Sequence, residues 1–411
     1  MSHSAVLNEL FESSLIICAG SGGVGKTTVA AALGLEGARR GLKVLVLTID
    51  PARRLADSLG MGPIGNEAVR IDPERLATLG VVDNGELWAL MLDAKRTFDD
   101  LVVRYAPSRE VADRILANRY YQQISRSMVG SQEYMAMEHL LSSFEQDYYD
   151  LVVLDTPPSR HALDFLRAPS RIRGVLEEGV LNWLLKPSSF LLRRVQRSAG
   201  VEGGGSFLET LERVIGLGMI RDLSEFVLLF KDMLGDFKQR ASGSQALLGA
   251  ERTRFVLVTS PNRTAVEEAA FFLQQISERG FHFGGFVINR VLPLAAGPTS
   301  QEDLDALRTM DDAAWYDLFP DTPPAGMSPS AYRRLLARLR ESLDTLPRVA
   351  GIDRANIRWL REAAGDQHLY VQIPELPFDV HDLESLGMLG ESFRTGFLEE
   401  HPAAHAGASS W

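Results

Sequence analysis

The chain has 411 residues, and its 43 Lys and Arg against 54 Asp and Glu give a formal net charge of −11. Apolar residues make up 45% and charged residues 24%, which is typical of a soluble globular protein, and the acidic total argues against a general nucleic-acid coat, which needs a basic surface. The single cysteine excludes a disulfide framework, and it excludes a cysteine zinc site or an iron–sulfur cluster held by one chain alone.

The first residues show no basic segment followed by an apolar one, so no secretory signal is visible. No run reaches about 18 consecutive apolar residues, so we expect no transmembrane helix and a cytoplasmic protein.

The first three elements follow each other closely. Residues 15–18 form an apolar run that predicts a buried strand and leads into a glycine-rich turn. Residues 27–40 are rich in alanine and stop at Gly41, which predicts a helix, and residues 43–49 predict a second buried strand. This order of strand, loop, helix and strand begins a doubly wound, mostly parallel sheet.

Further short apolar runs belong to the same sheet. They cover residues 87–92, 151–154, 255–259, 285–288 and 369–373. Helical patterns interrupt the alternation in three blocks, at 97–144, 172–248 and 301–364. We therefore expect an α/β fold with an inserted helical subdomain. In such sheets the loops at the carboxyl ends of the strands carry the ligand.

The loop after the first predicted strand carries the clearest motif. Residues 20–27 match G-x-x-x-x-G-K-[ST] between a strand and a helix, which is the context that the motif requires. The glycines let successive N–H groups and the helix N-terminus point at a diphosphate. Lys26 can reach the β- and γ-phosphates of a nucleotide, and Thr27 can place its hydroxyl on Mg²⁺. The alternative is a structural glycine turn. The nucleotide-binding residues predicted from this loop are Gly20, Ser21, Gly22, Gly23, Val24, Gly25, Lys26 and Thr27.

Two aspartates follow predicted strands in the places that a nucleotide hydrolase needs. Asp50 ends the second strand, where a carboxylate can orient a water toward the γ-phosphate. Asp155 ends the strand at 151–154, which is the Walker B pattern, and it would hold Mg²⁺ through its water shell. Each aspartate taken alone is also explained as a helix N-cap or a turn residue.

These motifs together resemble the arsenical-pump and tail-anchored-protein-targeting ATPases, which belong to the deviant Walker A class. The resemblance lies in Gly-Gly-Val-Gly-Lys-Thr-Thr at 22–28, Asp-Pro-Ala at 50–52 and Asp-Thr-x-Pro-x-x-His at 155–161. It continues in family order through the segments 87–102, 255–269, 284–293 and 374–387. It implies a fold of the P-loop NTPase type.

The resemblance also implies roles for particular residues. Lys26, Thr27 and Thr28 would bind the phosphates and Mg²⁺, with Lys26 and Asp50 as the catalytic pair. Asp50, Asp155 and His161 would form the switches that report the nucleotide state. Asn289 would contact adenine, and the loop from Pro374 to Val380 would close over the base. A solvent-exposed loop histidine remains the alternative for His161, and a turn-forming asparagine remains the alternative for Asn289.

A division of the chain follows from the resemblance. The ATPase core would comprise 1–96, 145–171 with the Walker B strand and second switch, 250–300 with the base-binding strand, and 367–395 with the base-closing loop. Helical insertions would occupy 97–144 and 301–366, and a helical subdomain with a possible client surface would occupy 172–249. Residues 396–411 would be a flexible tail.

The chain departs from this family at one position of the phosphate loop. Family members usually carry a lysine that reaches the partner's nucleotide across a dimer, and here that position is Ser21. A serine supplies no positive charge to the transition state. Three explanations remain open: hydrolysis is slow, a related chain supplies the lysine, or another cation substitutes. Arg53 and Arg54 are candidates for that cation, although both also fit a solvated helix start.

A second departure concerns metal sites. In the resembled family, the eukaryotic targeting ATPases share a zinc ion between paired cysteines at the dimer interface, and the arsenical pumps bind As(III) through cysteines. This chain has only Cys18, so neither site can be built. We expect Cys18 to be a buried core residue.

Two apolar stretches, 180–195 and 223–237, are candidates for a client-binding surface. Ordinary packing against each other is the alternative, and sequence alone favours it. Arg193, Arg194 and Arg197 fit either a solvated face or a peripheral contact with anionic lipid.

The reading that fits these observations is a dimeric, Mg²⁺-dependent ATP hydrolase that switches conformation with its nucleotide and handles a client protein. Its partner would be a second copy or a related ATPase, and no nucleic acid is expected. An alternative is a weakly hydrolysing, ATP-binding regulatory subunit of a lysine-bearing relative. A partition-type ATPase is less favoured because of the net charge of −11.

Overall fold

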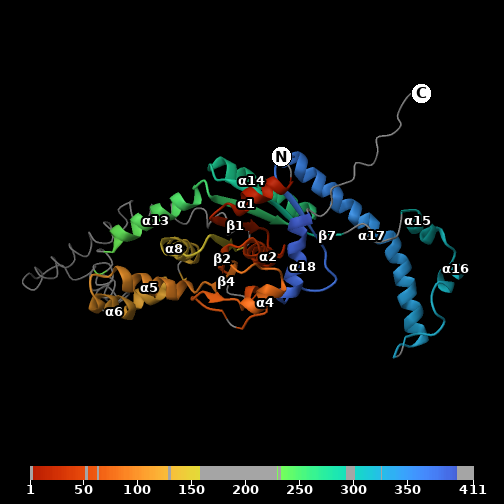
Figure 1. The fold of residues 1–411 in the computed structure, drawn as a ribbon, viewed down its shortest axis with the longest axis horizontal. Coiled ribbons are helices and arrows are strands. Elements are labelled where there is room, and N and C mark those ends of the chain that lie inside the picture. The colour runs from red at the N-terminus through yellow and green to blue at the C-terminus, as the bar shows by residue number, and fades with distance from the viewer. Residues whose placement is uncertain are drawn as a thin grey trace, which may run out of the picture.

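The apolar runs of the sequence come together in one eight-stranded sheet (Figure 1). The computed structural model describes residues 3–50, 54–62, 64–127, 131–157, 229, 233–292, 301–324 and 326–395. The strand order is β3-β4-β2-β5-β1-β6-β7-β8, and all neighbours pair in parallel except β3, which is antiparallel to β4. The predicted α/β fold with a mostly parallel sheet is therefore confirmed.

Seven of the eight strands match apolar runs that the sequence predicts. The strands are β1 (Leu15–Gly20), β2 (Lys43–Thr48), β3 (Val69–Arg70), β4 (Glu86–Met91), β5 (Leu151–Asp155), β6 (Thr253–Thr259), β7 (Phe283–Val291) and β8 (Tyr370–Pro374). The short edge strand β3 was not predicted, because both of its residues are exposed and it carries no apolar run. A central strand needs apolar residues on both faces, whereas an edge strand of two residues does not.

One face of the sheet is covered by α2 (Lys26–Arg39) and α18 (Leu383–Thr395), which also contact each other. Ile16 and Cys18 of β1 point to this face, and Cys18 is fully buried as expected. Three shorter helices add apolar side chains to the same cluster. They are α1 (His3–Phe11), α3 (Arg54–Ser58) and α4 (Pro73–Thr78).

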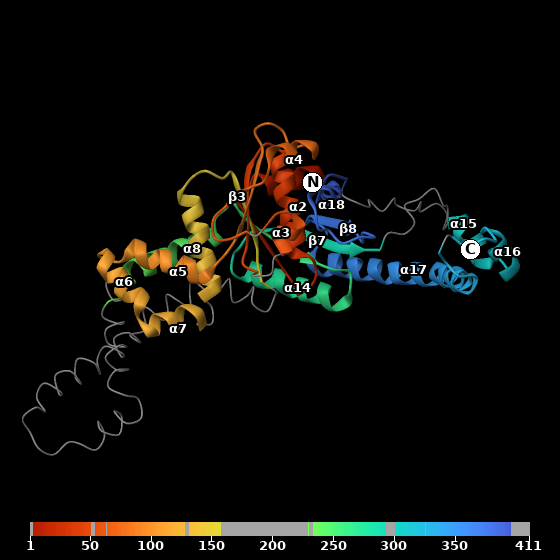
Figure 2. The ribbon, with the colours of Figure 1, turned by 90° about the horizontal axis from the view of Figure 1, so that it is seen from below.

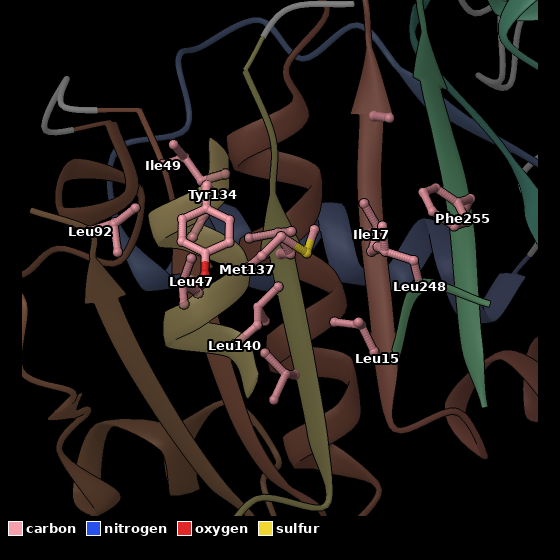
Figure 3. Packing of buried hydrophobic residues seen from close by; sticks show 14 of the residues in the cluster. Leu15, Ile17, Leu47, Ile49, Leu92, Tyr134, Met137, Leu140, Leu248 and Phe255 are labelled. Carbon is pink, nitrogen blue, oxygen red and sulfur yellow. The ribbon is translucent and has the colours of Figure 1, made fainter. Parts of the chain in front are cut away.

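The opposite face packs against a larger helical layer. Leu15 and Ile17 of β1 point into it, and they lie among Met137 and Leu140 of α8 and Leu248 of α13 (Figure 3). Residues 15–18 thus alternate between two buried faces, which explains why the strand is apolar throughout. The helices of this layer are α5 (Ala94–Tyr105), α6 (Arg109–Ala117), α7 (Arg119–Ser127), α8 (Ser131–Glu145), α13 (Leu234–Leu248) and α14 (Arg263–Glu278).

A buried ion pair joins α8 to α13. The guanidinium of Arg240 donates to the fully buried carboxylate of Glu138, and it also bonds Glu145 at 2.9 Å. The Tyr134 hydroxyl donates to the other oxygen of Glu138 at 2.8 Å. Because each of these groups has a partner, the network can be buried without leaving a charge unpaired.

The block after β7 forms α15 (Gln301–Thr309), α16 (Asp312–Asp317) and α17 (Pro329–Ala364). The second half of α17 lies along α14, and its first half projects away from the sheet together with α15 and α16 (Figures 1 and 2). Pro347 lies inside α17 and cannot donate to the carbonyl of Leu343, four residues earlier. Arg308 of α15 donates to that carbonyl at 3.1 Å, so the carbonyl still has a partner.

In the part of the chain that the structure describes, every helix is too short or too polar to cross a lipid bilayer.

Candidate functional site

The phosphate loop connects β1 to α2, as its motif requires. Gly25, the residue before α2, has φ of 90°, a left-handed conformation that favours glycine. A Cβ at Gly25 would lie 2.3 Å from Nδ2 of Asn289, so a side chain would displace that amide. The amide of Asn289 is largely buried and donates to the Val24 carbonyl at 2.9 Å. The loop is therefore held from the end of β7.

Asp155 lies under the loop and is 1% exposed. Its Oδ2 accepts hydrogen bonds from the hydroxyls of Thr27 at 2.6 Å and Thr48 at 2.8 Å. Its Oδ1 is buried and has no hydrogen-bond partner among the residues that the structure describes. Burial raises the pKa of Asp155 to about 6, and the two threonine hydrogen bonds oppose that rise. Sequence analysis did not identify Thr48, because a threonine near the end of a strand carries no motif.

The oxygens of Thr27 and Asp155 suit a hard divalent cation. Mg²⁺ prefers carboxylate and hydroxyl oxygens and keeps several of its waters. A buried carboxylate oxygen without a donor is costly unless a cation or a water satisfies it. The donor set therefore fits the Mg²⁺ ion expected beside a nucleotide.

Lys26 is the first residue of α2 and is largely buried. Its Nζ donates to the carbonyl of Ser21 at 2.8 Å, so the ammonium group folds back onto the start of the phosphate loop. Burial lowers the pKa of Lys26, while the carboxylates of Asp155 and Asp50 oppose this effect. A cation in this position lies where the loop would receive phosphate.

The hydroxyl of Ser21 donates to the carboxylate of Glu268 on α14. The position that carries a lysine in the resembled family is thus held by a hydrogen bond to an acidic residue. Sequence reasoning missed Glu268, because the two residues are 247 positions apart and Glu268 belongs to no motif. Glu268 does lie within 255–269, one of the segments that resemble the family, but the resemblance gave this residue no role.

Asp50 directly follows β2 and Thr48. Its backbone N–H donates to the Thr48 hydroxyl at 3.2 Å, and its Oδ2 lies 3.6 Å from Nη1 of Arg54. The side chain of Arg54 is 66% exposed, so this pair is weakly held. Arg53 and His161, the other residues considered around the switches, lie outside the described residues.

A cavity of about 850 Å³ brings most of the predicted residues together. This size is within the usual range for a small-molecule site. The predicted residues along its wall are Gly23, Gly25, Lys26, Thr27, Thr28, Asp50, Asn289 and Pro374. Phe378, Val380 and Leu389 add apolar surface. Phe378 and Val380 belong to the predicted loop from Pro374 to Val380, whereas Leu389 of α18 was not predicted.

A second cavity of about 570 Å³ also borders the phosphate loop. Ser21 and Gly22 line it together with Glu268 of α14 and Asp353 of α17. Gly23, Arg290 and Glu375 line both cavities.

The stretch 180–195, one of the two predicted apolar surfaces, lies outside the described residues. Of the stretch 223–237, Phe237 is described and is buried. Its ring lies 6.0 Å from that of Phe98 and 6.4 Å from that of Tyr134. Phe237 therefore packs in the core.

Comparison with known proteins agrees with this geometry. A sequence model described as anion-transporting ATPase matches residues 13–312. The chain is 26% identical over 309 residues to a protein named ATPase get3 from Aspergillus terreus, covering 71% of this chain and 81% of that protein. It is 26% identical over 281 residues to the ATPase get3 of Aspergillus niger, covering 67% and 72%.

A putative arsenical pump-driving ATPase of Halobacterium salinarum is 31% identical over 221 residues, which cover 51% of this chain and 30% of that protein. The chain thus spans less than a third of that relative. The family match covers most of the chain and includes the phosphate loop, Asp50, Asp155 and Asn289. From this match and the fold, the chain belongs to the anion-transporting ATPase family and is an ATPase.

Proposed function

We propose that this protein hydrolyses Mg²⁺·ATP to ADP and phosphate in the 850 Å³ cavity. The observation that carries the proposal is the buried Oδ1 of Asp155 beside the phosphate loop, which has no hydrogen-bond donor among the described residues. A cation bound there would neutralise negative charge that develops during phosphoryl transfer. Thr27 and Asp155 would hold it.

Each of the other residues has a role that its position supports. Lys26 would exchange its bond to the Ser21 carbonyl for a bond to the phosphates. Asp50, which faces the same cavity, would accept a hydrogen bond from the attacking water and orient it. Asn289 and the loop from Pro374 to Val380 would hold the base.

We also propose that the protein works as a dimer in the cytoplasm, where nucleotide binding and hydrolysis change the contact with a client protein. The similarity to ATPases named get3 supports a role in handling a client. A second candidate function is a weakly hydrolysing regulatory subunit of a related ATPase. It is supported by the Ser21–Glu268 hydrogen bond, because Ser21 supplies no cation to the site. A partition-type ATPase is the least favoured candidate.

The proposal is tested by Lys26→Ala. The variant should lose tight Mg²⁺·ATP binding and ATPase activity while its circular dichroism and thermal midpoint stay near those of the parent, because the ammonium supplies a charge-assisted contact to phosphate. Isothermal titration with Mg²⁺·ATP measures the binding. Lys95→Ala is the matched control and should bind ATP as the parent does. Lys95 does not line the 850 Å³ cavity: it pairs with Asp99 of its own helix, α5, and lies over the ring of Tyr121 of α7. Unchanged binding in Lys26→Ala would show that the nucleotide site lies elsewhere.

A further inference from the structure

Arg290 has a backbone conformation that is unusual for its residue type. Its φ is 62°, and among the described non-glycine residues only Asp147 shares a positive φ. The left-handed region is disfavoured for a residue with a long side chain, whereas asparagine and aspartate enter it more readily. A conformation of this kind persists when neighbouring contacts hold it, and it is concentrated at functional sites.

The two neighbours of Arg290 supply these contacts. The side chain of Asn289 is tied to the Val24 carbonyl of the phosphate loop, and the carbonyl of Val291 accepts the N–H of Glu375 at 2.9 Å. The pairing of β7 with β8 is irregular between Ile288 and Val291. Arg290 therefore lies at an irregularity of β7 between two anchored residues, and its side chain is exposed.

The position of Arg290 relates it to the phosphate loop. It lines the 850 Å³ cavity with Lys26 and Thr27, and it lines the 570 Å³ cavity with Ser21 and Gly23. Gly23 of the phosphate loop also lines both cavities, so Arg290 and the loop border the same space.

Within the described part of the chain, Arg290 also differs from Lys26 and Arg54, the other cations of the site, in its partners. Lys26 donates to the Ser21 carbonyl at 2.8 Å, and Arg54 lies 3.6 Å from Asp50. Arg290 forms no hydrogen bond or ion pair with any residue that the structure describes. A guanidinium offers five N–H donors in a planar fork that matches two phosphate oxygens, and its charge does not depend on pH in the physiological range.

We propose that Arg290 binds the triphosphate of ATP at the tip of the phosphate loop, and that it supplies positive charge that Ser21 does not. The inference rests on the proposed function, since it assumes that nucleotide occupies the 850 Å³ cavity. It adds a binding residue from β7 to those of the loop and α2. The ligand group is the phosphate chain, so the contribution of Arg290 should depend on the number of phosphates and not on the base.

The test variant is Arg290→Asn. Asparagine tolerates a left-handed backbone and removes the charge, so the fold should be kept. We expect Mg²⁺·ATP to bind about 10-fold to 100-fold more weakly, since a charge-assisted hydrogen bond to phosphate is lost. ADP should lose less affinity than ATP, and adenosine should bind as it does to the parent. Isothermal titration with the three ligands gives these ratios.

Two further variants separate a lost contact from a disturbed fold. Arg290→Gly relieves the backbone strain altogether and should show the same selective loss for ATP with an unchanged or higher thermal midpoint. Arg333→Asn removes the same charge from an exposed position, the fifth residue of α17, and should leave all three affinities unchanged. Adenosine binding that weakens as much as ATP binding in Arg290→Asn would overturn the proposal, because the substitution would then be acting through Asn289.

Lys26→Ala, titrated in parallel, distinguishes this inference from the proposed function. If Lys26→Ala loses ATP and Arg290→Asn binds it like the parent, the role of Arg290 is refuted and the nucleotide site stands. If Lys26→Ala still binds ATP like the parent, the site itself is refuted, and the inference fails with it.

Discussion

His139 lies on α8, in the layer that covers the sheet, and it carries an imidazole that folding keeps neutral. Burial lowers its pKa to about 4, and the nearby guanidinium of Arg104 lowers it in the same direction. In the unfolded chain a histidine titrates near pH ~6.5. The unfolded state therefore binds a proton between about pH 6.5 and 4 that the folded state does not, so this part of the stability is full above pH ~6.5 and is lost as the pH falls.

Replacing His139 should make this loss visible. The full shift corresponds to about 3 kcal/mol at 1.36 kcal/mol per pKa unit, and partial exposure of the ring reduces our expectation to about 1–2 kcal/mol. Between pH 7 and pH 4.5 the free energy of unfolding should fall in both proteins. We expect the fall to be about 1–2 kcal/mol smaller in His139→Gln than in the parent. Urea unfolding at each pH measures the difference, and the carboxylates that titrate in the same range affect both proteins equally. Parallel pH profiles would mean that the imidazole is hydrated in the folded state.

At the scale of residues, the site divides into a part that spacing predicts and a part that it does not. Lys26 and Thr27 follow from a contiguous motif, because the chemistry of a phosphate loop is set by neighbours in sequence. Glu268 and Arg290 do not, because their significance comes from long-range contacts and from the backbone at a strand irregularity. A single sequence shows neither the distance from Ser21 to Glu268 nor a left-handed arginine.

The packing of α2 on the sheet depends on two glycines that a helix would otherwise disfavour. A Cβ at Gly34 would lie 2.3 Å from Cγ2 of Val46 and 3.1 Å from Cδ1 of Leu87. A Cβ at Gly37 would lie 3.0 Å from Cγ2 of Val44. These positions allow the helix that begins the nucleotide site to lie close to β2, and a side chain at either would push it away.

Gly34→Ala should therefore destabilise the protein although alanine is the better helix former. Overpacking costs about 1–3 kcal/mol and the gain in helix propensity is about 1 kcal/mol, so we expect a net loss of up to about 2 kcal/mol. Gly351→Ala is the matched control, because a Cβ at Gly351 in α17 has no atom within 4 Å and should gain about 0.5–1 kcal/mol. Chemical unfolding compares the two variants. Equal stabilisation in both would contradict the close approach of α2 to β2.

At the scale of elements, the sequence predicts the buried strands well and the helical blocks only coarsely. Seven strands are recognisable because each contains a run of mainly apolar residues that is largely buried. Within residues 301–364, periodicity indicates helix, but it does not show that α17 continues through Pro347. That continuity needs Arg308 of a different helix to satisfy the carbonyl of Leu343, which is a tertiary contact.

At the scale of the whole molecule, the order of strands places the ends of β1, β2, β5 and β7 around one cavity. β1 lies at the centre of the sheet between β5 and β6, so the phosphate loop, Asp50 and Asp155 converge although they come from separate parts of the chain. Right-handed crossovers and a parallel sheet make this convergence predictable from the motifs alone. The assembly of two chains is not predictable in this way, since it depends on surfaces that no motif describes.

The proposed dimer leads to a prediction about the rate of the whole protein. The Ser21 hydroxyl is bound to Glu268 and supplies no charge, so a homodimer must draw its cations from other positions, such as Arg54 and Arg290. If two copies complete each other's sites, the ATPase rate per chain should rise with protein concentration and level off once the dimer saturates. Steady-state phosphate release over a wide concentration range measures this, with Lys26→Ala as the background at every point. A flat, near-zero rate with intact ATP binding would contradict a catalytic homodimer, and it would favour the regulatory subunit whose partner supplies the missing lysine.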